Sequence, residues 1–266
     1  MAPRRPLAGR VVLVTRAAHQ AGELVRLLER RGATVVVAPA IQVVPVRSAR
    51  LDRALRALVE GRYAWLVLTS RNGVEAVASR LTALGWRPAD VPARIAAVGE
   101  GTAEALRELG ARPALVPRTY TTEALARAFP RGEGRVLLAR ADVAPPGLEE
   151  AIAAKGWVPV RIDAYGTRFP RTLPAEARAA LRAGRVDAVT FASASAVRGF
   201  VRAVGPVRGN PRVVCIGPVT ARAAREAGFT VHAVARPHTL EGLVGAVERA
   251  LPPRTAQRAR HARSQA

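Results

Sequence analysis

Hydroxyl, amide and guanidinium side chains recur where predicted strands end, and two glycine turns accompany them. Such groups hydrogen-bond carboxylates and phosphates, but they neither donate electrons nor act as strong bases. As helix N-caps, the Ser and Thr residues also have an adequate structural explanation. Their recurrence at the same positions in both halves of the chain favours a ligand with several acid groups. The candidate binding residues are Arg16, Thr69, Ser70, Arg71, Asn72, Gly99, Thr102, Arg140, Ser193, Ser195, Gly217, Thr220 and Thr239.

Each glycine turn joins an apolar strand to a helix. Val213–Ile216 is followed by Gly217, and Thr220 is placed to cap a helix that begins directly after it. The same pattern occurs 118 positions earlier, at Gly99 and Thr102. A strand, a short turn and a helix N-terminus bring free N–H groups and a positive dipole end to one place, which suits an anion.

Tyr165 is a candidate acid. It lies in Asp163–Arg168, a segment that the sequence predicts to be an extended connector and not a core strand. Its hydroxyl could donate a proton to a leaving group beside the site. The alternative is an aromatic ring that packs the hinge, with its hydroxyl bonded locally. The residues alone leave both interpretations open.

Several other classes of chemistry lack their residues. Four dispersed His and one Cys offer no metal-ligand spacing, and neither nucleotide-binding fingerprint nor a readable Ser-His-Asp set is present. The one cysteine, Cys215, lies in a predicted buried strand without an intrachain partner. We interpret it as an inert thiol in a reducing compartment.

The formal net charge of +22 invites a nucleic-acid partner, but its distribution argues against one. Lys155 is the only lysine, and the arginines are scattered along predicted helix surfaces. A basic segment, 253–266, ends the sequence. No zinc-finger or RNP signature appears. Binding of a small polyanion explains the charge at least as well.

The sequence contains no membrane or export signal. No apolar stretch reaches the roughly 20 residues that a transmembrane helix needs, and Met1–Arg10 lacks an apolar segment before a cleavage site. We therefore expect a cytoplasmic protein without a membrane partner.

Predicted strands and helices alternate along a chain that repeats itself. Glu123 and Glu241 are 118 positions apart, as the two glycine turns are, and the strand ending at Arg16 resembles the one ending at Arg140. Several aligned motifs indicate an internal duplication. Each half supplies about five βα units, which predicts two doubly wound parallel sheets with ligands at the carboxyl ends of their strands.

The repeat allows two divisions of the chain. A tandem arrangement would divide it near position 132. However, extended connectors occupy equivalent places in both copies, at Ala40–Val46 and Asp163–Arg168. A crossing there would give one discontinuous and one inserted domain. Periodicity does not choose between the two.

Taken in order, these motifs resemble the uroporphyrinogen-III synthase family from about Val11 to Leu251. The resemblance implies two flavodoxin-like domains joined by a two-stranded linker. It places residues 1–40 and 171–252 in one domain and 43–166 in the other, with linkers at 41–46 and 163–170. The motifs are Leu13–Arg16, Thr69–Val74, Ala97–Gly99 with Thr102, Ala164–Thr167, Phe191–Ser195, Ile216–Ala221 and Thr239–Leu243.

The resemblance further implies a monomeric lyase that cyclises hydroxymethylbilane, a linear tetrapyrrole polycarboxylate, with inversion of its last ring, loss of water and no cofactor. By this resemblance Tyr165 is the proton donor and Thr220 a substrate contact. Arg71 and Ala194 stand where the family often has proline, and Ala192 where it often has threonine. These departures concern the two serine loops and not the fold.

Two other functions compete with the synthase. A retained two-lobed scaffold could bind a ligand without catalysis, as a regulator or sensor. A charge-driven nucleic-acid binder would show affinity that falls steeply with salt. The isomer of uroporphyrinogen that the protein makes from hydroxymethylbilane separates the synthase from both.

Overall fold

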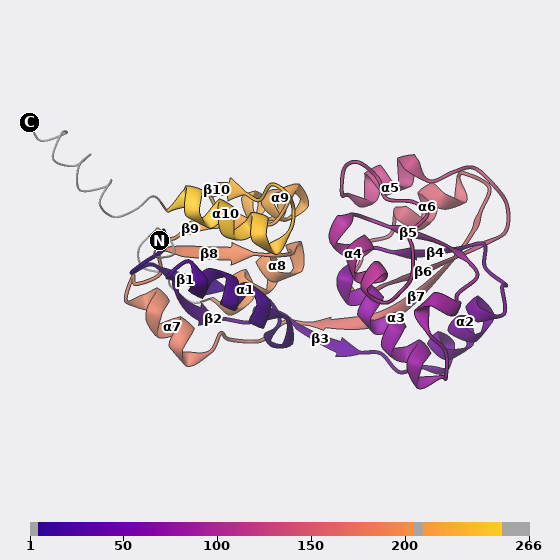
Figure 1. The fold of residues 1–266 in the computed structure, drawn as a ribbon, viewed down its shortest axis with the longest axis horizontal. Helices are drawn as coiled ribbons and strands as arrows, with labels where there is room; N and C mark the ends of the chain where they lie inside the picture. The colour runs from indigo at the N-terminus through magenta and orange to yellow at the C-terminus, as the bar shows by residue number, and fades with distance from the viewer. Residues whose placement is uncertain (1–4, 205–209, 252–266) are drawn as a thin grey trace, which may run out of the picture. The chain divides into compact units, whose positions relative to one another are not determined.

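The computed structural model describes residues 5–204 and 210–251 and folds into two compact units. Unit 1 comprises Met1–Gln42 and Arg168–Ala266, and unit 2 comprises Val43–Thr167 (Figure 1). Unit 1 is therefore discontinuous, and unit 2 is inserted between its two parts. The basic segment 253–266 lies outside the described residues.

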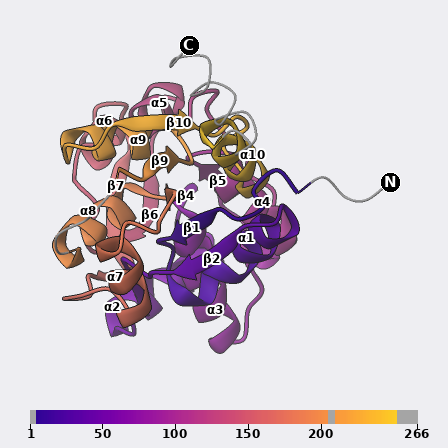
Figure 2. The same cartoon turned by 90° about the vertical axis from the view of Figure 1, so that its left-hand side faces the viewer.

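Unit 1 is a five-stranded parallel sheet with helices on both faces (Figure 2). Its strand order is β10-β9-β8-β1-β2. Its strands are β1 (Val11–Val14), β2 (Thr34–Val37), β8 (Ala188–Phe191), β9 (Arg212–Cys215) and β10 (Val231–Val234). Its helices are α1 (Ala18–Arg30), α7 (Ala175–Arg182), α8 (Ala194–Ala203), α9 (Pro218–Glu226) and α10 (Leu240–Ala250). Helices α1 and α10 bury one face, and α7, α8 and α9 bury the other.

The discontinuous parts of unit 1 are joined by buried polar contacts as well as by strand pairing. Arg10 is 6% exposed, and its Nη1 lies 2.9 Å from Oδ1 of Asp187. The second carboxylate oxygen of Asp187 accepts the backbone N–H of Val11 at 2.8 Å. This ion pair links the start of β1 to the start of β8, 177 positions later in the chain.

Unit 2 contains a second sheet in the order β3-β7-β6-β4-β5. Its strands are β3 (Gln42–Pro45), β4 (Trp65–Leu68), β5 (Arg94–Ala97), β6 (Arg135–Ala141) and β7 (Val158–Arg168). Its helices are α2 (Ala49–Val59), α3 (Arg71–Ala83), the 3-10 turn η1 (Pro88–Asp90), α4 (Glu100–Glu108), α5 (Thr122–Ala128) and α6 (Leu148–Ala153). Helices α2, α3 and α4 bury one face, and α5 and α6 the other.

Four neighbouring strands have the same arrangement in both sheets, but the chain enters that arrangement at different strands, which explains the repeat in the sequence. In each sheet one interior strand, β8 or β4, separates the strand of the glycine turn from the strand that leads to Arg16 or Arg140. Unit 1 begins its chain at β1, the counterpart of β6, whereas unit 2 reaches β4 before β6. The strand order reverses beside β8 and β4, and a doubly wound sheet binds its ligand at such a switch point.

Three details differ from the sequence predictions. The short apolar run Ala114–Val116 predicts one more strand after the first glycine turn, but the structure has only one bridge there, between Ala96 and Leu115. The expected connector at Asp163–Arg168 is the end of β7, and β3, from the other connector, pairs with β7 (Figure 1). Helix α9 begins at Pro218 and not after Thr220, because Gly217 is the N-cap and proline suits the first helical position.

The edge strand β10 depends on a neutral histidine. The pairing of β10 with β9 shifts register at His232, and Nδ1 of His232 accepts the backbone N–H of Val213 at 3.0 Å. Burial, and then the positive charge of Arg212, lower the pKa of His232. Protonation would remove the acceptor, so this contact requires the neutral ring.

We therefore expect acid to weaken unit 1 through His232. The unfolded chain binds this proton more tightly than the native state, so the contribution is complete above about pH 6.5 and is lost as the pH falls through the lowered native pKa. Urea unfolding at pH 7.5 and 5.5 tests this. His232→Asn keeps an acceptor that does not titrate, so it should lose less stability between the two pH values than wild type. An equal loss, matched by a His19→Asn control at an exposed position, would contradict the assignment.

Candidate active site

The carboxyl edge of unit 2 brings several predicted residues together. Thr69 and Ser70 follow β4 directly, and Ser70 is the N-cap of α3. Its Oγ accepts the backbone N–H of Gly73 at 3.0 Å. A Cβ at Gly73 would lie 3.4 Å from the carbonyl oxygen of Ala139, so the first turn of α3 packs closely on β6. The serine hydroxyl is thus fixed at the switch point between β4 and β6.

Tyr165 meets this helix start. Its side chain is 7% exposed, and its Oη lies 2.9 Å from Oγ of Ser70. Burial raises the pKa of the Tyr165 hydroxyl, and the carboxylate of Asp142 adds to the rise. Hydrogen bonds from Ser70 and Asn72 and the charge of Arg140 oppose that rise in pKa. The hydroxyl is therefore protonated at neutral pH.

A β-bulge turns Tyr165 toward α3. Along β6 and β7, Ala139 pairs with Ile162, but Ala141 pairs with Tyr165 and not with Ala164. Side chains alternate between the faces of a sheet, and one inserted residue reverses that alternation. As a result Ala164 and Tyr165, although adjacent, both lie in the core beneath α2, α3 and α4. Without the bulge, Tyr165 would lie on the face covered by α5 and α6.

Arg140 is buried and already paired. It is 3% exposed, and its Nη1 contacts both carboxylate oxygens of Glu149 at 2.8 Å and donates to the carbonyl of Pro145 at 2.9 Å. Its Nε has no hydrogen-bond partner within the described part of the chain. Arg140 therefore fixes the loop after β6, and its charge is largely balanced by Glu149.

Arg71 also forms an ion pair with a carboxylate of the same unit. Its two terminal nitrogens donate to the carboxylate of Glu108 at 3.2 and 3.0 Å, linking α3 to α4. Burial lowers the pKa of the Arg71 guanidinium, but the hydrogen bond to Glu108 and the charges of Glu108, Glu75 and Glu104 outweigh burial and raise that pKa. Glu108 and Glu149 were not predictable as partners of these arginines, because an ion-pair partner on another element leaves no local signal in the sequence.

Both glycine turns lead into helices without a side-chain cap. Gly99 is the N-cap of α4, as Gly217 is of α9. Thr102 and Thr220 are the third residues of these helices and are buried, at 5% and 4% exposed. The prediction that Thr220 is an N-cap is therefore wrong, and Thr102 is not an N-cap either. A glycine N-cap offers no side-chain acceptor to the first turn of its helix, an arrangement that suits an anion.

Neighbouring loops lie over these turns in both units. A Cβ at Gly99 would lie 2.7 Å from the Cβ of Tyr120, and one at Gly217 would lie 3.7 Å from the ring of His238. Tyr120 and His238 occupy equivalent places in the duplication. At Gly99 only a residue without a side chain allows this approach.

The remaining candidates lie at the carboxyl edge of unit 1. Ser193 caps α8 by accepting the N–H of Ala196 at 3.1 Å, and Thr239 caps α10 through the N–H of Gly242 at 3.2 Å. Ser195 accepts from Arg198 at 3.0 Å. Arg16 follows β1 at the switch point between β1 and β8. All of these residues follow strands of unit 1 at the predicted edge of the sheet.

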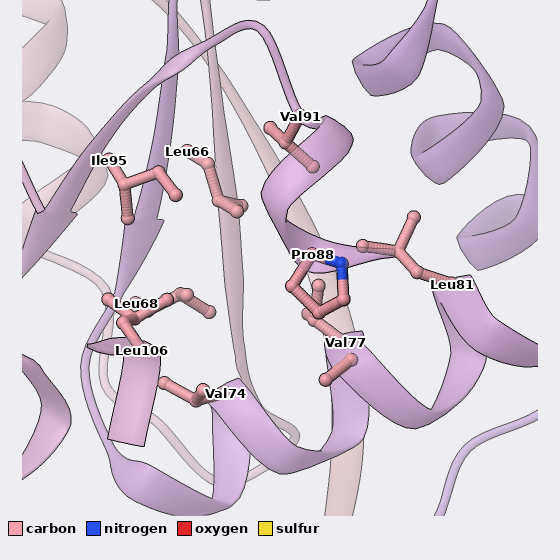
Figure 3. Close-up of a pocket in the computed structure, with 10 residues that line it drawn as sticks. Leu66, Leu68, Val74, Val77, Leu81, Pro88, Val91, Ile95 and Leu106 are labelled. Carbon is pink, nitrogen blue, oxygen red and sulfur yellow. The ribbon is translucent and has the colours of Figure 1, made fainter. Parts of the chain in front are cut away.

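The one cavity described in unit 2 does not coincide with these residues. It is a void of about 10 Å³ under α3, and its walls are apolar side chains of β4, β5, α3, α4 and η1 (Figure 3). A space this small without polar groups does not hold an ordered water. It is a packing defect of the core and not a binding site. Its lining residues are Leu66, Leu68, Val74, Val77, Ala78, Leu81, Pro88, Val91, Ile95 and Leu106.

Two kinds of feature are absent from residues 5–204 and 210–251. No group of three or more His, Cys, Asp or Glu side chains is arranged to hold a metal ion. No helix there is long and apolar enough to cross a bilayer.

Cys215 is buried, and burial raises the pKa of its thiol to about 12, which keeps the thiol protonated.

Comparison with known proteins gives a consistent result. The family model described as "Uroporphyrinogen-III synthase HemD" matches residues 22–245. The chain is 32% identical over 256 residues to the uroporphyrinogen-III synthase of Synechococcus elongatus, covering 92% of this chain and 96% of the relative. It is 29% identical to a putative uroporphyrinogen-III synthase of Methanothermobacter thermautotrophicus, covering 88% and 96%.

Solved structures agree with the sequence comparisons. A variant uroporphyrinogen III synthase of Thermus thermophilus matches with a TM-score of 0.66 and 26% identity, covering 91% of this chain and 98% of that one. A uroporphyrinogen-III synthetase of Helicobacter pylori shares the fold, with a TM-score of 0.57. Because the family model spans most of the sequence and a relative above 30% identity is covered almost end to end, the chain belongs to the uroporphyrinogen-III synthase family and is an enzyme of porphyrin biosynthesis.

Proposed function

We propose that this enzyme is a lyase that cyclises hydroxymethylbilane to uroporphyrinogen III, with inversion of the last pyrrole ring and loss of water. The observation that carries the proposal is the Tyr165 hydroxyl, held against the start of α3 by Ser70 at 2.9 Å. A proton donor fixed beside helix N-termini suits a substrate with many carboxylates and one hydroxyl to be expelled.

The first step is the loss of the terminal hydroxyl. Tyr165 gives its proton to that hydroxyl, the C–O bond breaks and water leaves, while the lone pair of the pyrrole nitrogen forms the azafulvene. The last ring then attacks the azafulvene through its substituted carbon to give a spiro intermediate. The bond between the spiro carbon and the methylene bridge to the third ring then breaks, and the free α-carbon of the last ring attacks that methylene carbon to close the macrocycle. The proton lost from this α-carbon on aromatisation restores Tyr165.

Binding and folding of the substrate account for the remaining residues. The uncapped starts of α4 and α9, at Gly99 and Gly217, present N–H groups to carboxylates. The hydroxyls of Thr69, Ser193 and Thr239 lie at the same kind of edge. Holding a flexible chain in its reactive shape removes much of the entropic barrier. We propose that the enzyme acts as a monomer in the cytoplasm and that this chemistry needs no cofactor.

The isomer of the product tests the proposal. Purified protein is given hydroxymethylbilane, and the uroporphyrinogen isomers are separated after oxidation. Spontaneous closure yields the unrearranged type I isomer, so a reaction without protein is the control. We expect type III to predominate. Type I alone would overturn the proposal, and tight binding of the bilane without any type III would favour a binding protein instead.

A further inference from the structure

The Tyr165 hydroxyl has partners that the proposed reaction does not yet use. Ser70 lies 2.9 Å from the phenol oxygen, and Asn72, two residues further along α3, also hydrogen-bonds it. The bulge before Tyr165 brings the ring to this helix, and the N-cap bond to Gly73 fixes Ser70. The start of α3 and the bulged end of β7 thus meet at one oxygen atom.

We propose that Ser70 and Asn72 are positioning residues that both donate to the Tyr165 oxygen, so that the tyrosine proton points at the substrate and the phenolate left behind is stabilised. This rests on the proposed function and deepens it, because it assigns these two side chains to the acid and not to substrate carboxylates.

The hydrogen-bond capacity of Ser70 supports this direction. Its Oγ carries one proton and two lone pairs, and the N–H of Gly73 occupies one lone pair. If the serine proton goes to Tyr165, the tyrosine proton is free for the leaving hydroxyl. If the tyrosine proton went to Ser70 instead, it would be withheld from the substrate.

The presence of a second partner, Asn72, limits the choice between the two directions. The phenol carries one proton, so it cannot donate to both Ser70 and Asn72, and both must donate to its oxygen when that proton points at the substrate. With Asn72 and Ser70 both donating, the oxygen that becomes negative after proton transfer already has two donors. Fixed donors at a developing oxyanion are worth up to about 10²–10³-fold in rate each; Tyr165 keeps its remaining neighbours, so we expect about tenfold for each.

The test compares variants that change these donors with variants that do not. Ser70→Ala removes the hydroxyl and Ser70→Thr retains it. Asn72→Asp exchanges a donor for an acceptor but places an acid in the first turn of α3, where it stabilises the helix. Ser48→Ala is the matched control, because Ser48 caps α2 through the N–H of Leu51 at 3.1 Å. It loses the same kind of cap without touching Tyr165.

Two measurements separate positioning from substrate binding. With hydroxymethylbilane, Ser70→Ala and Asn72→Asp should each lower kcat by about tenfold or more, with KM unchanged within about twofold, while Ser70→Thr and Ser48→Ala stay close to wild type. The second measurement uses the free protein and follows the ¹³Cζ signal of Tyr165, which is identified by its loss in Tyr165→Phe. This signal should titrate at higher pH in Ser70→Ala and Asn72→Asp than in wild type, and at the wild-type pH in Ser48→Ala.

Each contrary result has a distinct meaning. A raised KM with an unmoved Tyr165 signal would overturn the proposal, because Ser70 or Asn72 would then contact the substrate. A moved signal with unchanged kcat would also overturn it. If the wild-type protein formed no type III isomer, the proposed function would fail, while the titration of the free protein would still decide whether the two donors converge on Tyr165.

Discussion

Tyr165→Phe is expected to lower kcat by about ten- to a hundredfold and to leave KM within about twofold of wild type. The ring still fills its place in the core, where it is 7% exposed, so the fold and the substrate contacts remain. Only the proton donor is lost. Steady-state kinetics with hydroxymethylbilane, with type III formation as the readout, measures the effect.

Tyr63 provides the control for this substitution. It is another buried tyrosine of unit 2, at 4% exposed, but its hydroxyl contacts Arg135 at 3.4 Å, at the start of β6 and so at the opposite end of the sheet from Ser70. Tyr63→Phe should therefore leave kcat unchanged. Equal turnover by Tyr165→Phe and wild type would remove Tyr165 from the mechanism and favour its role as a packing residue of β7.

Gly242→Ala is expected to destabilise unit 1 by about 2–3 kcal/mol, the largest effect on stability among our predictions. A Cβ at Gly242 would lie 1.9 Å from the backbone carbonyl oxygen of Pro237, so α10 and the loop before it would have to separate. A backbone oxygen has no rotamer by which to move away. The cap from Thr239 to Gly242, at 3.2 Å, would be disturbed at the same time.

Gly245 lies on the same helix and gives the matched comparison. A Cβ there would lie 3.5 Å from the mobile end of Arg249, so Gly245→Ala should stabilise α10 by about 0.5–1 kcal/mol through helix propensity. Thermal unfolding of the two variants measures the difference, with a Tm several degrees lower for Gly242→Ala. A Gly242→Ala protein as stable as Gly245→Ala would show that the loop adapts without cost.

The repeat in the sequence predicted the two parallel sheets, because strand-ending arginines, serine caps and glycine turns mark the same edge in each copy. It also led to Ser70 and Asn72, whereas Tyr165 came from its place in the predicted connector and from the family resemblance; the structure brings the three together. The placement of Tyr165 in a strand was not predictable. A bulge adds one residue without a change in composition, so the end of β7, Asp163–Arg168, was predicted as a connector.

Charge pairing was the other feature that local patterns could not give. Arg71 and Arg140 were predicted to face a ligand, but Glu108 and Glu149 hold their guanidinium groups. Glu108 reaches Arg71 because α4 packs against α3. Glu149 reaches Arg140 because α6 follows the loop after β6. The start of α9 was recoverable from the sequence, because Gly217 followed by Pro218 marks an N-cap and a first helical residue.

The pairing of β3 with β7 has a consequence for how the gene could be divided. The inserted unit enters through one of these neighbouring strands and leaves through the other, so its two ends emerge side by side. An insertion of this kind can be excised, or transplanted into a loop of another host, without stretching either end. Because the two ends are close, the two parts of unit 1 can be rejoined by a short turn after unit 2 is removed. The folding of each unit can then be measured separately.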